Sequence, residues 1–229
     1  MKKKELKIVV FAPHPDDELV GAGSMLKWKE EGHDIHIIYI TDGRAAYRYE
    51  RARGELFESE ETMNTTEDEL AEIRMKEIDD VIEFLEIPNE NIHKFKIPDQ
   101  DAKNHIKEGI ELSKTLIKDA DRIVLPSNNN SHEDHQATYE IVVGAAKELD
   151  LKNTEFYGYA IYVAQRTPRE KLVKINIVKY RDRIYEAISK YKSQLAISIV
   201  RKFYDTIKKK PAEFFGKYSL SDIGQYYNF

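Results

Sequence analysis

The sequence predicts an α/β fold of the Rossmann-like type, a three-layer sandwich with helices on both faces of a mostly parallel sheet. Two observations support this prediction. Short apolar runs alternate along the chain with longer segments whose apolar residues recur at helical spacing, and this alternation is typical of βαβ units. The 229 residues, 41% of them hydrophobic and 34% charged, are enough for one sizeable core. We therefore expect a single α/β domain over residues 1–229.

The first part of the chain is expected to form a strand–helix–strand unit. Residues 6–12 are an apolar strand, residues 19–31 an amphipathic helix, and residues 35–41 a second apolar strand. Such strands are usually parallel and joined by a right-handed crossover. Pro15 suits the first turn of the helix, where a missing N–H costs nothing. No Gly-x-Gly-x-x-Gly motif follows the first strand, so a dinucleotide cofactor is not expected.

Residues 45–69 interrupt the alternation. The segment is charged, carries Tyr47 and Tyr49, and has little steady periodicity. A long insertion after a strand is often a lid or a substrate-binding loop. A partly helical, solvated segment explains the same composition equally well, and the sequence leaves both interpretations open.

The remaining segments continue the pattern of strands and helices. Residues 196–229 carry no pattern to which we assign a role. The elements expected before them are helices over 70–85, 106–117, 136–149 and 177–195 and strands over 93–97, 122–126 and 156–163.

Metal-ligating residue types follow two of these strands. His14, Asp16 and Asp17 come after the first strand, and a second group occupies residues 131–135 after the strand at 122–126. Parallel neighbouring strands open at the same sheet edge, where ligands bind. One imidazole and two carboxylates within four residues form an unfavourable turn unless a cation is held there. We therefore expect a divalent metal, most readily Zn²⁺, in a site without thiolates because the chain has no cysteine.

His14, Asp17 and His135 are the expected metal ligands. Two neutral imidazoles and one carboxylate leave a zinc site with a net charge near +1, which lowers the pKa of bound water towards ~7. Neighbouring residues on a helical turn point roughly 100° apart. Asp16 should therefore lie beside the metal without binding it, which is where a general base is needed.

The other residues of the second group receive catalytic roles. We expect His132, as an imidazolium, to stabilise an oxyanion or protonate a leaving amine, and Asp134 to orient a histidine. Simpler interpretations exist for each residue taken alone. The acidic residues at 16–18 and Asp134 could cap helices, and His132 could be an ordinary polar loop residue.

Both groups resemble motifs of a known family. Residues 14–18, HPDDE, resemble the signature of the LmbE/PIG-L family of zinc-dependent N-acetylglucosaminyl deacetylases, and residues 131–135, SHEDH, are similar to its His-Pro-Asp-His motif. Glu133 replaces the usual proline. The resemblance implies zinc binding by His14, Asp17 and His135, a catalytic base at Asp16, and stabilisation of the transition state by His132.

Weaker correspondences concern the substrate. The resemblance extends over residues 6–195, and segment 45–69 has no counterpart in it. Arg74 and Glu77 resemble a family Arg-x-x-Glu helix that contributes to the substrate pocket, although a surface pairing of the two residues explains them equally well. Residues 191–194, YKSQ, resemble a family Tyr-x-Ser-Gln segment. Together with the end of the second strand, these segments give the expected substrate-binding residues Arg74, Asp42 and Gln194.

These features predict a metal-dependent hydrolase that removes an N-acetyl group from a small-molecule substrate containing glucosamine. One alternative is a non-haem Fe(II) oxygenase, because such enzymes also use two histidines and one carboxylate. The adjacent Asp16 favours hydrolysis, since an oxygenase needs no base there. A non-catalytic metal- or sugar-binding domain is the second alternative, and an unrelated α/β domain whose histidines never converge is the third.

Composition excludes several other classes. The net charge of −5 gives no basic footprint for nucleic acid. No run of about 18 apolar residues exists, so no membrane span is expected, and the first residues lack the apolar region of a signal peptide. The absence of cysteine fits a reducing compartment, and we expect a cytoplasmic protein. The sequence is compatible with a homo-oligomer.

Overall fold

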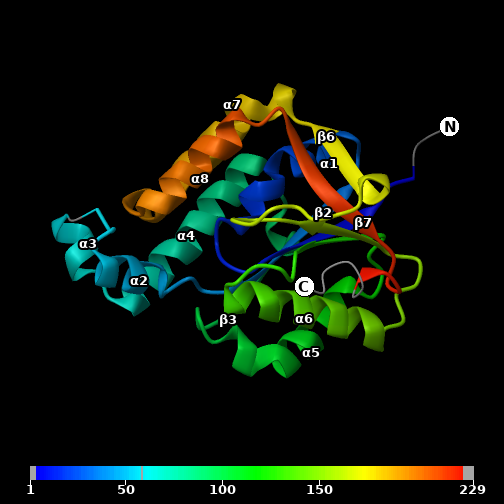
Figure 1. Ribbon diagram of the computed structural model, residues 1–229, viewed down its shortest axis with the longest axis horizontal. Helices are drawn as coiled ribbons and strands as arrows, with labels where there is room; N and C mark the ends of the chain where they lie inside the picture. Colours follow the sequence, from blue (N-terminus) through cyan, green and yellow to red (C-terminus); the bar gives the residue numbers. More distant parts are fainter. Residues whose placement is uncertain (1–3, 58, 224–229) are drawn as a thin grey trace.

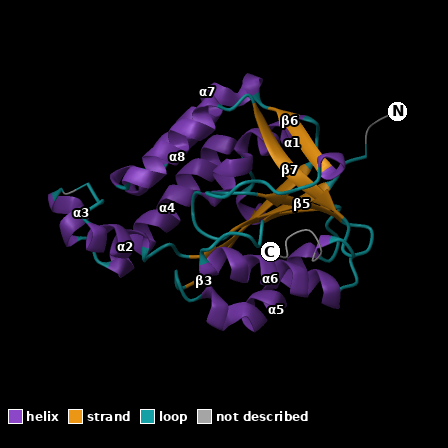
Figure 2. Ribbon diagram, in the orientation of Figure 1, coloured by secondary structure: helices purple, strands orange, loops and turns teal. Residues whose placement is uncertain are grey.

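The chain folds around a seven-stranded sheet that lies between two layers of helices (Figures 1 and 2). The computed structural model describes residues 4–57 and 59–223. The strand order is β3-β2-β1-β4-β5-β7-β6. The first five strands in this order are parallel, whereas β7 runs antiparallel to β5 and β6. The strands are β1 (Lys7–Ala12), β2 (Asp34–Thr41), β3 (Ile92–Ile97), β4 (Arg122–Pro126), β5 (Glu155–Tyr159), β6 (Leu172–Asn176) and β7 (Ala212–Tyr218). The predicted α/β fold with a mostly parallel sheet is confirmed.

The helices cover both faces of the sheet. In Figure 1, α5 and α6 lie below it and α1, α4, α7 and α8 above it, with α2 and α3 at the far end of α4. The α-helices are α1 (Ala22–Glu30), α2 (Ala46–Arg53), α3 (Glu60–Asn64), α4 (Glu67–Leu85), α5 (Ile106–Ile117), α6 (Glu133–Glu148), α7 (Arg181–Lys190) and α8 (Ser198–Lys209). Short 3₁₀ turns are η1 (Asp17–Gly21), η2 (Asn89–Asn91), η3 (Ala102–His105), η4 (Arg169–Lys171), η5 (Val178–Tyr180) and η6 (Ser193–Ala196). None of the helices in the described ranges combines the length and apolar character needed to cross a bilayer.

Strand β1 lies in the middle of the core. Ile8 and Val10 pack into the hydrophobic cluster shared with α1, α4, α7 and α8, while Val9 and Phe11 pack into the cluster shared with α5 and α6. Successive side chains of a strand point to opposite faces. A central strand covered on both faces is therefore an uninterrupted apolar run, as parallel strands in α/β proteins usually are.

This topology determines where a site can form. Strand β1 pairs with β2 on one side and with β4 on the other, all parallel. The chain order along the sheet reverses between β1 and β4, which makes this the topological switch point where α/β folds bind ligands. The HPDDE and SHEDH segments follow these two strands. The predicted common edge is therefore present.

Several element boundaries differ from the prediction. The helix expected over 19–31 is preceded by the 3₁₀ turn η1, and α1 begins only at Ala22. Residues 45–69 contain two short helices, α2 and α3, joined by a loop. The helix expected over 177–195 ends at Lys190. The segment after residue 195, which received no assignment, forms both α8 and strand β7.

Candidate metal centre and substrate cavity

Three ligand-type side chains converge at the switch point. Asp17 Oδ2 lies 3.1 Å from His14 Nδ1 and 3.4 Å from His135 Nε2. His14 comes from the turn after β1, Asp17 from η1, and His135 from the first turn of α6. All three side chains are buried, and their ligand atoms lie within 4.8 Å of one another. The predicted convergence of these three residues is present in the structure.

The environment gives two of these side chains the charge states that metal ligands require. Burial lowers the pKa of His135 to about 4, which keeps its imidazole neutral at pH 7. Burial opposes the charge on Asp17, but the facing His135 ring and the hydrogen bonds of His14 lower its pKa to about 2. Neutral imidazole and ionised carboxylate are the forms that bind metal. Burial opposes charge on His14, but the facing Asp99 and Asp134 carboxylates raise its pKa, so a metal would displace a proton from this ring. The donor set therefore fits Zn²⁺, which takes histidine nitrogen and carboxylate oxygen.

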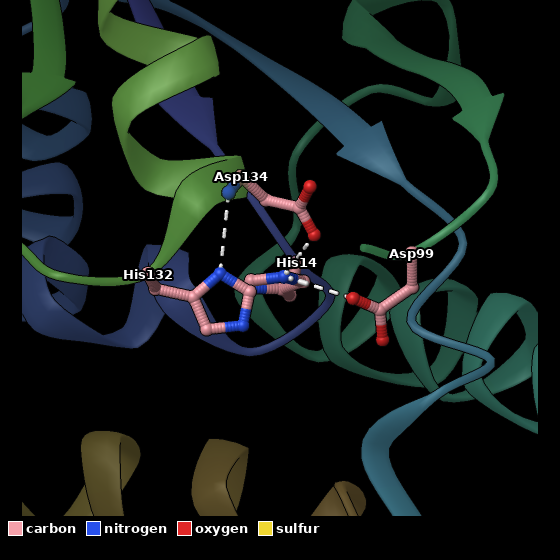
Figure 3. A group of neighbouring side chains, drawn as sticks. All are labelled: His14, Asp99, His132 and Asp134. Atoms are coloured by element: carbon pink, nitrogen blue, oxygen red, sulfur yellow. Dashed lines mark hydrogen bonds and ion pairs between the residues drawn. The ribbon is translucent and has the colours of Figure 1, made fainter. Parts of the chain in front are cut away.

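The opposite edge of the His14 ring faces two carboxylates (Figure 3). His14 Nε2 lies 3.1 Å from Asp134 Oδ2 and 3.2 Å from Asp99 Oδ1. The Asp134 side chain is fully buried and also accepts hydrogen bonds from the backbone N–H groups of Gln100 (2.7 Å) and Ala102 (3.1 Å). A carboxylate on the far nitrogen fixes the tautomer and orientation of a metal-binding histidine. Asp134 is thus placed to orient His14.

Two of the four side chains in Figure 3, His132 and Asp134, already accept hydrogen bonds from backbone N–H groups. His14, Asp99, His132 and Asp134 could form a second cluster of donors. However, His132 Nδ1 already accepts the backbone N–H of Asp134 at 3.2 Å, as the N-terminal cap of α6. The oxygens of Asp134 are likewise used by backbone donors. In the cluster of His14, Asp17 and His135, Asp17 Oδ2 accepts one backbone N–H, that of His14 at 3.0 Å.

His132 differs from the expected imidazolium. Burial and the neighbouring His14 ring lower the pKa of His132, and the ring centroids of the two histidines are 4.7 Å apart. The neutral form is therefore favoured at pH 7. Because Nδ1 accepts a backbone N–H, the proton of the neutral ring is on Nε2.

Asp16 lies beside the ligand cluster in an unusual conformation. Its φ is 105°, a region that few non-glycine residues adopt but that asparagine and aspartate tolerate best. Arg74 Nη2 donates to Oδ1 at 3.1 Å, and the Tyr204 hydroxyl donates to Oδ2 at 2.8 Å. The backbone N–H of Asp16 donates to Glu18, whose carboxylate also accepts from Tyr191. Burial raises the pKa of Asp16 to about 7, although the Arg74 charge opposes the shift. These acids form a network around the site instead of capping a helix.

Arg74 is used within the protein. Besides Asp16, its guanidinium donates to the backbone carbonyls of Pro15 and Gly43. Gly43 has φ +67°, and a Cβ there would lie 2.5 Å from Arg74 Nη1. The turn after β2 therefore requires glycine so that the guanidinium can approach its backbone. Arg74 holds the Asp16 carboxylate and also lines the cavity, so its role in substrate binding stays a prediction.

The alternative pairing of Arg74 with Glu77 is not seen. Glu77 instead accepts hydrogen bonds from the backbone N–H and hydroxyl of Ser193, at 2.7 and 2.6 Å. This contact anchors the segment 191–194 to α4. Gln194, predicted to bind substrate, is buried and lines the cavity, where Nε2 donates to the Ser193 hydroxyl at 3.1 Å.

Asp42 follows β2 as expected, but its carboxylate does not face the cavity. Its carboxylate accepts hydrogen bonds from Arg44 Nε at 2.8 Å and from the backbone N–H of Asp99 at 3.2 Å. Asp42 is buried and is not among the residues that line the cavity. The strand end is correctly located, but the carboxylate supports the loop that carries Asp99 instead of facing a substrate.

A cavity of about 480 Å³ opens in front of the ligand cluster. Segment 45–69 contributes one wall, through Ala45, Ala46, Tyr49 and Glu50. The remaining lining residues are His14, Asp16, Asp17, Arg74, Asp99, Gln100, Ser131, His132, His135, Tyr162, Gln194, Ile197, Ile199 and Val200. A small sugar fits a cavity of this size, because ligand pockets typically enclose ~300–1,000 Å³.

Sequence reasoning missed three of the residues around this cavity. Asp99 follows the parallel strand β3. The two motifs were located because they also follow parallel strands, so the same signal could have identified Asp99. Tyr204 lies on α8, in the segment for which the sequence predicted no role, and it is one of the buried residues of this helix together with Val200 and Ile207. Glu50 lies in the charged α2, where nothing in the sequence separates it from its neighbours.

Comparison with known proteins adds to this geometry. The family model described as "PIG-L: GlcNAc-PI de-N-acetylase" matches residues 9–146, which is more than half of the chain. The chain belongs to the PIG-L family. The membership predicted from the two motifs is confirmed.

Solved structures share the fold. N,N'-diacetylchitobiose deacetylase from Pyrococcus horikoshii aligns over 94% of this chain and 85% of its own, at 18% identity and a TM-score of 0.68. The zinc-inhibited form of teicoplanin deacetylase Orf2 aligns over 92% of this chain and 97% of its own, at 14% identity and a TM-score of 0.68. GalB, the 4-carboxy-2-hydroxymuconate hydratase of Pseudomonas putida KT2440, aligns over 94% and 96%, at 15% identity and a TM-score of 0.62. At these identities the likeness concerns the fold.

One curated relative matches over a short stretch. A putative glucosamine-6-phosphate deaminase-like protein of Bacteroides thetaiotaomicron is 39% identical over 41 residues, which are 18% of this chain and 6% of that protein. The match thus covers a small part of that relative's length.

Proposed function

We propose that this chain is a metal-dependent amide hydrolase that removes the N-acetyl group from a substrate containing N-acetylglucosamine. The observation that carries the proposal is the convergence of His14, Asp17 and His135 at the switch point, with the separately held carboxylate of Asp16 beside them. Membership of the PIG-L family supports the choice of reaction. The N-acetylated sugar in the name of the Pyrococcus neighbour supports the choice of substrate class.

We assign the metal to His14 Nδ1, Asp17 Oδ2 and His135 Nε2. A zinc ion in that position supplies a Lewis acid and lowers the pKa of a water molecule to near neutrality. The fold is also found in a zinc-inhibited deacetylase, so the metal that supports the fastest turnover has to be measured.

The chain's own side chains perform the proton transfers. Asp16 accepts a proton from the nucleophilic water and delivers it to the nitrogen of the leaving amine, with its two oxygens held by Arg74 and Tyr204. His132, neutral and with its proton on Nε2, donates a hydrogen bond to the oxygen of the acetyl carbonyl as negative charge develops there. Asp134 keeps the His14 ring in one orientation.

Two alternatives make different predictions. A non-haem Fe(II) oxygenase shares the two-His-one-carboxylate ligand set, but it does not need a base at Asp16. A non-catalytic domain would bind metal and sugar without changing the substrate. The hydratase with this fold shows that likeness of fold does not determine the reaction.

The test is acetate release from N-acetylglucosamine and its glycosides by protein that is first stripped with a chelator and then reloaded with Zn²⁺, Co²⁺, Mn²⁺ or Fe²⁺. We expect stoichiometric acetate and free amine, no activity after chelation, and the same rate without oxygen. Activity that requires oxygen would support the oxygenase. Sugar binding without acetate release by any metal form would support the binding domain.

A further inference from the structure

The cavity wall is rich in carboxylates and poor in free positive charge. Asp16, Asp17, Asp99 and Glu50 all line it. Among its described lining residues, Arg74 is the one lysine or arginine. That guanidinium is already bonded to Asp16 and to two backbone carbonyls. Away from the metal ligands, the wall therefore has no uncommitted lysine or arginine for an anionic part of a substrate, and its carboxylates disfavour one.

Glu50 is the carboxylate with no assigned task. It lies on α2, its residue is 8% exposed, and its buried Oε2 has no hydrogen-bond partner. The neighbouring arginines bond to other groups. Arg53 donates to Glu55 and to the Tyr49 hydroxyl, both at 3.1 Å, and Arg51 donates to the carbonyl of Thr62 at 2.8 Å.

A buried acceptor without a partner has an energetic cost. Leaving such an oxygen unsatisfied is unfavourable. Burial and the nearby Glu55 carboxylate raise the pKa of Glu50, and hydrogen bonds donated to its carboxylate would oppose this shift. Because Glu50 lines the cavity, rotation of its carboxylate toward a bound ligand would let the ligand supply such bonds. Hydroxyl groups of a sugar or other polyol are such donors.

We propose that Glu50 is a substrate-binding residue that accepts hydrogen bonds from hydroxyl groups of the substrate, and that the carboxylate wall selects glycosides with a neutral, hydroxylated aglycone over those that carry phosphate there. The inference deepens the proposed deacetylase function and depends on it for the sugar part of the substrate. It also separates this chain from the substrate in the family's name, GlcNAc-PI, whose phosphatidylinositol carries a phosphodiester.

The experiment compares three N-acetylglucosaminides of glycerol: the neutral glycoside, its glycerol phosphate, and an analogue with an amine on the glycerol. Calorimetry on zinc-loaded Asp16→Asn protein measures binding, and acetate release by protein with Asp16 intact measures kcat and KM. We expect the neutral glycoside to bind at least about tenfold more tightly than the phosphate, because the phosphate places a like charge beside the Glu50 carboxylate whereas the neutral glycoside donates a hydrogen bond to it.

Variants at position 50 isolate the contribution of Glu50. Glu50→Gln should weaken binding of the neutral glycoside about tenfold and reduce the preference over phosphate, with the loss in KM rather than kcat because the contact is away from the reacting bond. Glu50→Asp, which keeps the charge on a shorter side chain, should keep the rejection of phosphate. Glu60→Gln removes the same charge from an exposed residue of α3 outside the cavity wall and should change neither value.

Each other outcome contradicts part of the inference. Equal binding of neutral and phosphorylated glycosides, or a Glu50→Gln variant indistinguishable from Glu60→Gln, would overturn it while leaving deacetylation intact. Preferential binding of the amine analogue, lost in Glu50→Gln, would replace the neutral aglycone with a cationic one. If the neutral glycoside binds preferentially but no acetate is released, the proposed reaction is overturned while Glu50 remains a substrate-binding residue.

Discussion

Replacing Asp16 with asparagine separates proton transfer from metal binding. The substitution removes the carboxylate that we assign as the general base but preserves its shape. Asparagine also tolerates positive φ, so the backbone at φ 105° is retained. An amide oxygen can still accept the hydrogen bond from Arg74 or from Tyr204, while the amide NH₂ faces the other donor. The metal ligands His14 and His135 are untouched.

The expected loss of rate follows from the role. General base catalysis typically contributes ~10²–10⁴-fold, so kcat should fall by about that factor. Arg74 loses its charged partner inside the protein, and an uncompensated buried charge costs up to ~3–5 kcal/mol. The two remaining backbone carbonyl contacts of Arg74 reduce this cost, and we expect a destabilisation of about 1–3 kcal/mol.

Acetate release, zinc content and thermal unfolding are measured side by side on this variant. Slow turnover with full zinc content and a folded protein is the predicted combination. Turnover within about twofold of the unmodified protein would refute the assignment of Asp16 as base. Loss of zinc would instead show that Asp16 is itself a metal ligand, contrary to its bonds with Arg74 and Tyr204.

Three further substitutions test the surroundings of the site. Asp134→Asn removes the carboxylate that orients His14 and should weaken zinc affinity about 10–100-fold, measured by chelator competition; unchanged affinity would contradict that role. Tyr204→Phe removes one hydrogen bond to Asp16 and should lower kcat roughly 3–10-fold at constant zinc content, since such a bond contributes ~1 kcal/mol; an unchanged kcat would count against it. Glu213→Gln tests the pH dependence of stability. Burial raises the pKa of Glu213 to about 7 from 4.5, so between these pH values the folded state keeps a proton that the unfolded state loses. The free energy of unfolding should therefore fall from pH 4.5 to 7 by at most ~3 kcal/mol. Urea unfolding at several pH values should show this slope with Glu213 present and a flatter profile in the variant; identical profiles would contradict it.

The candidate site could be located from sequence because one physical rule places it. Parallel strands open at a common edge, so ligand-type residues after β1 and β4 had to meet if the strands were neighbours. The rule gives the location of a residue and not the partner of its side chain. Asp42 lies at such a strand end, yet its carboxylate bonds to Arg44 and to the backbone of Asp99.

Other parts of the site depend on contacts that local sequence does not encode. Tyr204 reaches Asp16 across 188 positions of the chain, because α8 packs on the face of the sheet that α7 also covers. Asp16 has a positive φ, and its backbone N–H donates to Glu18, which also accepts from Tyr191. These hydrogen bonds also explain why the predicted start of the first helix was wrong. The acids at 16–18 match a helix start, but their side chains turn inward and α1 begins at Ala22.

The proposed function requires that two motifs far apart in the chain build one metal site. Elemental analysis of zinc in purified protein tests this, with His14→Ala and His135→Ala beside the unmodified chain and His105→Ala, a half-buried histidine outside the cavity, as the control. We expect about one zinc per chain in the unmodified protein. This zinc should be lost in His14→Ala and His135→Ala and retained in His105→Ala. Full zinc in either site variant, with the protein folded, would contradict a shared centre.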